Sequence, residues 1–117
     1  MTIAELITLT AATDMTPDTD KSAPVSCGYT CDLLSWVMAH GKAGMAWITV
    51  QTHINVIAVA ALMDMACVIL PEGIQMEDAS LKKAREEGVT VLHSSLTAYE
   101  LCARMAQAGL PGDVQEG

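Results

Sequence analysis

Aromatic residues are nearly missing from this sequence: it has no phenylalanine, and its tryptophans and tyrosines make up only 3% of 117 residues. A hydrophobic core must therefore be built from aliphatic side chains and from an unusual number of methionines, eight in all. Hydrophobic residues still account for 51% of the chain and charged residues for 17%, which disfavours extensive intrinsic disorder. This length and composition predict one domain with one core.

Positive charge is also scarce, with six lysine and arginine residues against fourteen aspartates and glutamates and a net charge of −8. Proteins that bind nucleic acid need clustered cations to neutralise phosphates, so no nucleic-acid partner is expected. The same acidity disfavours docking on anionic membranes.

Targeting and membrane-spanning segments are not recognisable either. The N-terminus lacks the basic start and the long apolar run of a signal peptide. The richest apolar stretch, residues 54–70, contains Asn55 and Asp64 and is broken at Pro71, whereas a spanning helix needs about 20 apolar residues. We therefore expect no membrane association and a cytoplasmic protein whose four cysteines are reduced.

What the sequence does contain is an alternation of strand-like and helix-like segments. Thr2 and Glu5 have the spacing of a capping box, so residues 3–9 predict a short helix. The polar, acidic stretch TDMTPDTDKSAP with its two prolines predicts a mobile loop. The elements predicted after it are strands 25–30, 46–51, 66–73 and 89–95, alternating with helices 32–40, 52–64, 76–88 and 96–109.

Four strand–helix repeats predict a single three-layer α/β domain with a largely parallel sheet of about four strands flanked by helices. The two central strands are apolar throughout, as a sheet covered on both faces requires. The helix over 52–64 is rich in Val, Ile and Ala and is expected to be buried nearly all round. The predicted organisation is an N-terminal helix and mobile acidic loop (1–24), the α/β domain (25–109) and a frayed tail (110–117).

Ligands of open α/β sheets bind beyond the carboxyl ends of the strands. The polar residues that follow these predicted ends are the candidate ligand-binding residues, namely Asp32, Gln51, Thr52, His53, Asn55, Glu72, His93, Ser94 and Ser95. Thr52 and His53 are the most informative, because free backbone N–H groups and the helix dipole at a helix start can receive an anion. The competing interpretation is that Thr52 only caps the helix and His53 hydrogen-bonds to a neighbouring loop. Asp32 is itself a possible cap of the helix over 32–40.

Four side chains, Cys27, Cys31, His53 and His93, are of the kind that binds zinc. A C-x3-C spacing followed by isolated histidines is much weaker than paired CxxC motifs. The other two cysteines, at 67 and 102, lie in apolar contexts and are expected to be small core residues. We predict no cofactor, with zinc or an iron–sulfur cluster as the alternative.

Motifs of catalysis are missing as well. The GKAG stretch at 41–44 matches neither of the glycine-rich phosphate-binding motifs. His93 and Ser94 cannot form part of a triad as strand neighbours, because adjacent strand residues point to opposite faces. The sequence thus favours a non-enzymatic protein without deciding the question. Trp36, one position off the apolar stripe of its predicted helix, either contacts a partner or covers the edge of the core.

The runs GYTCDLLSWVMAHG, AWITVQTHINVIAVAALMD, VILPEG and LTAYEL resemble the DRTGG-type domain, which is similar to the N-terminal domain of HPr kinase/phosphorylase. The resemblance covers about residues 25–105, is distinctive over 32–38 and 47–55, and extends to small stand-alone DRTGG-like proteins, some labelled hydrogenase-related. It implies a compact α/β regulatory or ligand-sensing module, often in an oligomer. It implies no kinase activity, because the phosphate-binding loop belongs to a separate domain. The DRTGG string itself is absent from this sequence.

Three interpretations follow. The first is a non-catalytic regulatory or ligand-sensing module, a homodimer, that binds a small anionic or nucleotide-like ligand at the carboxyl edge of the sheet. The second is a protein-interaction or accessory subunit of a larger, hydrogenase-related complex, with Trp36 at the interface. The third is a metal or iron–sulfur protein that uses His53 and His93.

Overall fold

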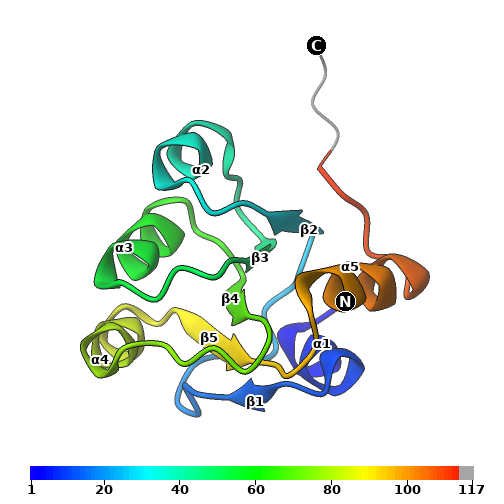
Figure 1. Cartoon of the computed structure of the whole chain (residues 1–117), viewed down its shortest axis with the longest axis horizontal. Helices are drawn as coiled ribbons and strands as arrows, with labels where there is room; N and C mark the ends of the chain where they lie inside the picture. Colours follow the sequence, from blue (N-terminus) through cyan, green and yellow to red (C-terminus); the bar gives the residue numbers. More distant parts are fainter. Residues whose placement is uncertain (114–117) are drawn as a thin grey trace.

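Five helices and five strands follow one another along residues 1–113, which are the residues that the computed structural model describes (Figure 1). The helices are α1 (Ile3–Thr10), α2 (Leu34–His40), α3 (Ile54–Leu62), α4 (Asp78–Glu87) and α5 (Ala98–Gln107). The strands are β1 (Thr13–Asp14), β2 (Cys27–Thr30), β3 (Met45–Ile48), β4 (Cys67–Leu70) and β5 (Thr90–His93). The longest helices have ten residues, and no helix in this described part is long and apolar enough to cross a membrane.

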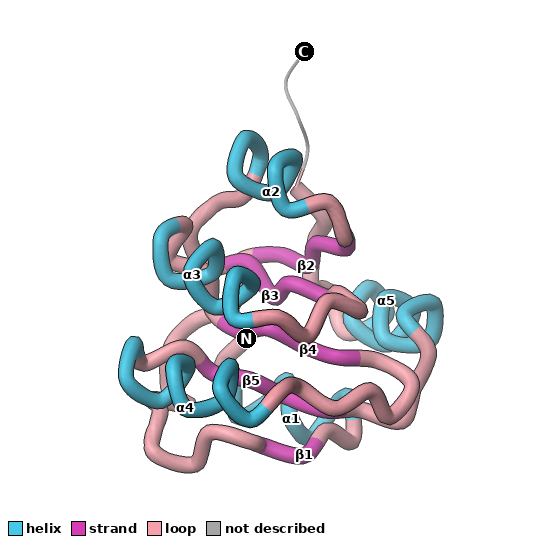
Figure 2. The backbone as a smooth tube through the Cα atoms, turned by 60° about the vertical axis from the view of Figure 1, so that its left-hand side comes forward, coloured by secondary structure: helices cyan, strands magenta, loops and turns pink. Residues whose placement is uncertain are grey.

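The strands form one sheet in the order β1-β5-β4-β3-β2, in which β2 to β5 are parallel and β1 is antiparallel. Helices α2, α3 and α4 connect successive parallel strands. Because such crossovers are right-handed and the strand order runs in one direction, all three helices lie on the same face of the sheet (Figure 2). Helices α1 and α5 pack together on the other face. This arrangement confirms the predicted three-layer α/β fold.

Local sequence signals account for the ends of several helices. Thr2 and Glu5 form the predicted capping box of α1, in which each accepts a hydrogen bond from the backbone N–H of the other. The hydroxyl of Thr97 accepts from the backbone of Glu100 at the start of α5. Gly88 ends α4 with a φ of 72°, a conformation in which glycine is favoured.

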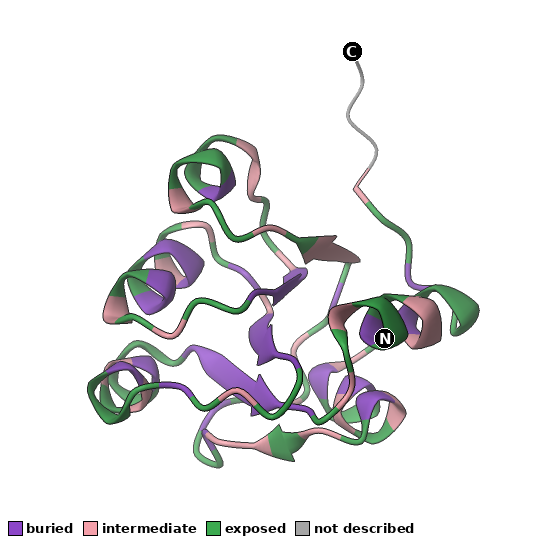
Figure 3. Cartoon of the chain, viewed as in Figure 1, coloured by how far each residue is buried: buried purple, intermediate pink, exposed green. Residues whose placement is uncertain are grey.

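The centre of the sheet is dry: every residue of β3, β4 and β5 is buried (Figure 3). Helices cover these strands on both faces, which explains their continuous apolar sequences. Trp47 is the largest side chain in this core, and its indole N–H donates to the backbone oxygen of Cys31 at 2.8 Å. Met45, Met65 and Met76 are also buried and fill space that aromatic residues occupy in other cores.

Helix α3 is buried on one side only, so the prediction of burial nearly all round is wrong. Val56, Ile57, Val59 and Ala60 face the core. Leu62 is 69% exposed, because no further element of the described residues 1–113 packs on the outer side of α3. An apolar composition alone cannot distinguish a helix covered on all sides from one that leaves an apolar surface open.

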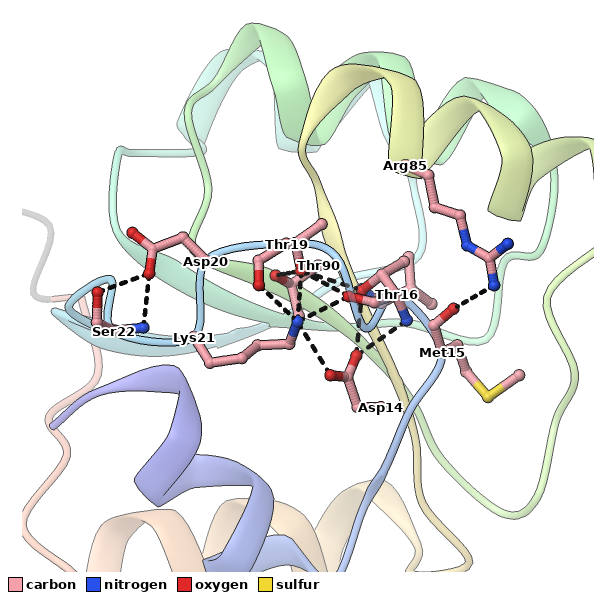
Figure 4. Close-up of polar contacts among 10 residues, drawn as sticks. Asp14, Met15, Thr16, Thr19, Asp20, Lys21, Ser22, Arg85 and Thr90 are labelled. Atoms are coloured by element: carbon pink, nitrogen blue, oxygen red, sulfur yellow. Dashed lines mark hydrogen bonds and ion pairs between the residues drawn. The ribbon is translucent and has the colours of Figure 1, made fainter.

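The short strand β1 was not predicted. It pairs with β5, placing Thr13 opposite His93, and the loop after it is closed by hydrogen bonds (Figure 4). The ammonium group of Lys21 lies 2.9 Å from a carboxylate oxygen of Asp14 and donates to the backbone oxygens of residues 16 and 19. The hydroxyl of Thr19 lies 2.6 Å from that of Thr90 in β5. Residues 1–24 thus contribute β1 to the sheet and α1 to the core. The mobility of the loop stays a prediction.

The segment after α5 returns to the edge of the sheet. Leu110 is buried, the N–H of Gly28 in β2 donates to the oxygen of Pro111 at 2.9 Å, and Gly28 forms a parallel bridge with Gly112. Asp113 pairs with the ammonium of Lys42. Of the tail predicted to fray, residues 110–113 therefore lie along β2, while 114–117 lie outside the described residues.

Candidate functional site

The candidate residues lie at one edge of the sheet, because the four parallel strands end there. They do not converge on one point. The structure separates them into three groups: Asp32 with Gln51; Thr52, His53 and Asn55 at the start of α3; and Glu72, His93, Ser94 and Ser95 at the ends of β4 and β5.

Asp32 joins two neighbouring loops. One oxygen of its carboxylate accepts from the hydroxyl of Thr49 at 2.8 Å and from the backbone of Val50 at 3.0 Å. The side-chain amide of Gln51 donates to the backbone oxygen of Asp32 at 3.2 Å. The possibility that Asp32 caps α2 is therefore wrong: the residue at the cap position is Leu33, which offers no side-chain hydrogen bond.

Helix α3 is capped by His53, so the prediction that Thr52 caps this helix is wrong. The imidazole Nδ1 of His53 accepts from the backbone N–H of Asn55 at 3.1 Å, and both side chains are exposed. Thr52 instead ties the loop to α4: its hydroxyl donates to Glu77 at 3.1 Å and its backbone oxygen accepts from the hydroxyl of Ser80 at 2.9 Å. This leaves Gln51, His53 and Asn55 as polar side chains exposed around the start of a helix.

His93 and Ser94 point into the protein. The Nε2 atom of His93 accepts from the backbone N–H of Met76 at 3.2 Å, and burial lowers the pKa of this imidazole below its ordinary value of 6.5. The hydroxyl of Ser94 donates to the backbone oxygen of Thr10 at 3.1 Å. Both residues thus hold neighbouring segments in place, and their role as ligand contacts stays a prediction.

Glu72 and Ser95 are the exposed residues of this third group. Glu72 adopts a φ of 58°, which is uncommon for a residue other than glycine. Its N–H donates to the backbone oxygen of Leu96 at 2.8 Å, and that of Gly73 donates to Ser94 at 2.9 Å. The turn after β4 is therefore closed against the loop after β5, and its backbone N–H groups are already used.

Two residues of this edge were missed in the sequence: Thr49 and Glu77, the partners of Asp32 and Thr52. Thr49 lies within the predicted strand 46–51 and had no signal beyond its strand propensity. Glu77 precedes a charged helix, where acidic residues are common. Pairs separated by 17 and 25 residues depend on the register of the sheet, which local patterns do not reveal.

The cysteines are free thiols that do not form a metal site in the structure. Across residues 1–113, no group of three or more His, Cys, Asp or Glu side chains is arranged to hold a metal ion. Cys67 is buried as predicted, and burial raises the pKa of its thiol to about 12. Cys102 is exposed, so its prediction as a core residue is wrong; its sulfur lies 3.4 Å from the hydroxyl of Thr30.

Trp36 lies on α2 with 54% of its surface exposed, and its ring stacks on that of His40 with the centroids 4.0 Å apart. Its role as a partner contact stays a prediction. Surface cavities of about 420 and 200 Å³ include none of the candidate residues. A groove of about 330 Å³ between α2 and α3 includes one of them, Asn55.

A solved structure with the same fold is the crystal structure of the CBS and DRTGG domains of the regulatory region of Clostridium perfringens pyrophosphatase, complexed with the activator diadenosine tetraphosphate. The two superpose with a TM-score of 0.74 over 93% of this chain at 13% sequence identity. This chain spans about half, 47%, of the length of that one. The likeness supports a DRTGG-like fold for this chain, as the sequence resemblance implies.

No protein-family model matches this sequence. No curated protein matches it either.

Proposed function

We propose that this protein is a non-catalytic regulatory module that senses a small nucleotide-like ligand at the carboxyl edge of its sheet. The observation that carries the proposal is the junction between β3 and α3, where Gln51, His53 and Asn55 are exposed around the N-terminus of a helix. Backbone N–H groups at such a terminus favour phosphate or carboxylate. The proposal is supported by the shared fold with a regulatory region that was solved with a bound dinucleotide.

The charges at this edge sharpen the class of ligand. Its four loops, all within residues 1–113, contain Asp32, Glu72 and Glu77 but no lysine or arginine. A polyphosphate would meet three carboxylates and no fixed cation, which disfavours it. A nucleoside monophosphate carries less charge and offers base and ribose groups to the amides of Gln51 and Asn55. We therefore expect tighter binding of a monophosphate than of a polyphosphate.

A thermal-shift and calorimetric comparison tests this proposal. Adenosine and guanosine monophosphates, ATP, diadenosine tetraphosphate and inorganic phosphate are titrated into the full chain. A ligand at about 100 times its dissociation constant stabilises the folded state by about 2.7 kcal/mol, a shift easily resolved in a small domain. His53→Ala should weaken binding at least tenfold. Gln107→Ala, which removes an exposed amide on α5 away from this edge, should not.

The proposal is abandoned if none of these compounds raises the unfolding temperature. It is equally abandoned if the His53 variant binds as tightly as the control, since the contact would then lie elsewhere. Tighter binding of ATP than of the monophosphates would contradict the charge argument. Only the proposed position of the ligand, at the carboxyl edge of the sheet, would then remain.

A role as an interaction or accessory subunit is the second candidate function, and the exposure of Trp36 favours it. We also propose that the module acts as a homodimer. The sequence resemblance alone supports the hydrogenase-related partner and the closer likeness to HPr kinase/phosphorylase. Co-purification of the tagged chain with hydrogenase components tests that partner. A Trp36→Ala variant that retains every bound protein would exclude this residue as the anchor.

A further inference from the structure

Helices α2 and α3 present an uncharged surface on an acidic protein. Neither Leu34–His40 nor Ile54–Leu62 contains an aspartate, glutamate, lysine or arginine, although the chain has a net charge of −8. Seven large hydrophobic residues of the described part are exposed, and four of them lie on or beside these helices: Leu33, Trp36, Met38 and Leu62, exposed by 62, 54, 51 and 69%. Surface helices of monomeric proteins normally carry charge, so this face calls for an explanation.

The face is shaped as well as apolar. A groove of about 330 Å³ runs between the two helices, lined by Leu34, Met38, Asn55, Ala58, Val59 and Leu62. Three of these residues, at 55, 58 and 62, are spaced as the exposed stripe of one helix face. The small side chain of Ala58 leaves room in the groove for large apolar side chains from another molecule. On α2, the small residues Ser35 and Ala39 are exposed beside Met38.

Two exposed apolar residues lie at the centre of the face: Met38 and Leu62 line the groove, whereas Leu33 and Trp36 do not. Trp36 is two residues from Met38, about 200° round the helix, and therefore lies on another side of α2. At about 100 Å² each, Met38 and Leu62 supply on the order of 200 Å² of apolar surface. A standard interface buries about 800 Å² on each partner, so the contact must extend from the groove over its small and polar neighbours.

The charge pattern favours a second copy of this chain as the occupant. A basic partner would find no carboxylate to pair with on either helix, whereas a second copy brings an equally uncharged face. Two copies with a charge of −8 repel each other at most orientations, and an uncharged face is where this repulsion is smallest. We propose that two copies associate through the α2–α3 face in an isologous contact, in which the outer stripe of each α3 packs at the groove of the other copy.

This inference deepens the proposed homodimer by naming the surface that joins its two copies. Helix α4 lies beside α3 in the same layer and supplies the matched control (Figure 2). The mass of the full chain is measured by sedimentation and by light scattering from about 10 μM to 1 mM at 0.15 M salt. The variants are Leu62→Glu within the face and Ala79→Glu at an exposed position of α4.

We expect the wild type and Ala79→Glu to reach twice the monomer mass within this range. Leu62→Glu places two carboxylates in one desolvated contact and should weaken association by about 30-fold or more. Leu62 is largely exposed, so this variant should retain the circular dichroism and the unfolding midpoint of the isolated monomer. Met38→Glu, on the opposite wall of the groove, provides a second variant with the same expected loss.

A wild type that stays monomeric at 1 mM overturns the inference, and a different occupant of the face would then have to be sought. A dimer that survives both Leu62→Glu and Met38→Glu also overturns it, while leaving the homodimer itself intact. Thermal shifts with nucleotides, recorded on the same variants, separate the two proposals: a monomer that still binds a nucleotide refutes the dimer and retains the ligand-sensing function.

Discussion

Helices α3 and α4 lie side by side on the same face of the sheet, yet they are held there by different forces. Helix α3 buries Val56, Ile57, Val59 and Ala60 and contains no charged residue. Helix α4 buries only Ser80 and Ala84, and six of its ten residues are charged. Helix α3 is attached to the sheet through buried apolar surface. Helix α4 is attached largely through polar contacts at its N-terminus. The comparison shows that two helices in the same layer of a fold can differ widely in composition.

The polar attachment of α4 begins just before the helix. His93 accepts from the backbone N–H of Met76, and the β3–α3 loop bonds to both Glu77 and Ser80 through Thr52. These bonds join α4 to the same loop that carries the candidate ligand residues. The hydrogen bonds of Thr52 therefore link the start of α3 to the start of α4.

The largest expected effect comes from truncating the buried side of α3. Ile57→Ala removes a fully buried side chain from the core and should lower the free energy of unfolding by about 2–5 kcal/mol, measured by urea denaturation. Leu81→Ala, a similar truncation on α4, should cost clearly less because this residue is partly exposed. Equal losses would break the comparison between the two helices.

Acid should act on the polar attachment of α4. The pKa of His93 is lowered in the folded state, so between its folded pKa and 6.5 the unfolded chain binds more protons than the folded one. The stability that this group contributes is therefore complete above pH 6.5 and decreases as the pH falls below it. A protonated imidazole also cannot accept the hydrogen bond from Met76.

Hydrogen exchange from pH 7.5 to 5 measures this effect, after correction for intrinsic rates. Amides of residues 76–87 should lose more protection than those of α3, and His93→Gln should remove the difference. Equal loss in both helices would show that acid unfolds the domain as a whole, without a weak point at α4.

The smallest effect is expected on the outer surface of α4. Lys83 and Glu87 form an ion pair of 3.0 Å one helical turn apart, with both side chains well exposed to solvent, and this pair raises the pKa of the lysine. Such pairs are screened by water and salt. Lys83→Ala should leave the urea midpoint unchanged within error at 0.5 M salt. A clear loss there would show that α4 depends on its charges more than on the polar contacts at its N-terminus.

Some of these features could be predicted from the sequence, because they depend on neighbours along the chain. The capping box of Thr2 and Glu5 is of this kind and is confirmed. The cap at Thr97 and the end of α4 at Gly88 depend on equally local signals. The order of strands and helices follows from the same local patterns. The carboxyl edge could also be located, since its residues follow the ends of parallel strands.

The errors concern contacts between segments that are distant in the sequence. Strand β1 has two residues, too few for a periodic signal, and exists through its pairing with β5. Asp32 is a residue type that often caps helices, and it precedes a helical pattern. The register of β2 against β3 instead brings Thr49 and Val50 to its carboxylate. Cys102 has an apolar context and an exposed side chain, because its position around α5 decides its burial.

Local composition and spacing determined which segments of this chain become helices and strands, because capping and periodicity act over a few residues. The parallel sheet and its polar edge follow from their alternation. Only the tertiary structure decided which polar groups at that edge are already bonded and which remain open. It also decided that α3, uncharged along its whole length, leaves one apolar side uncovered. Burial depends on what packs against a segment, and no other element within residues 1–113 packs on the outer side of α3 at Leu62.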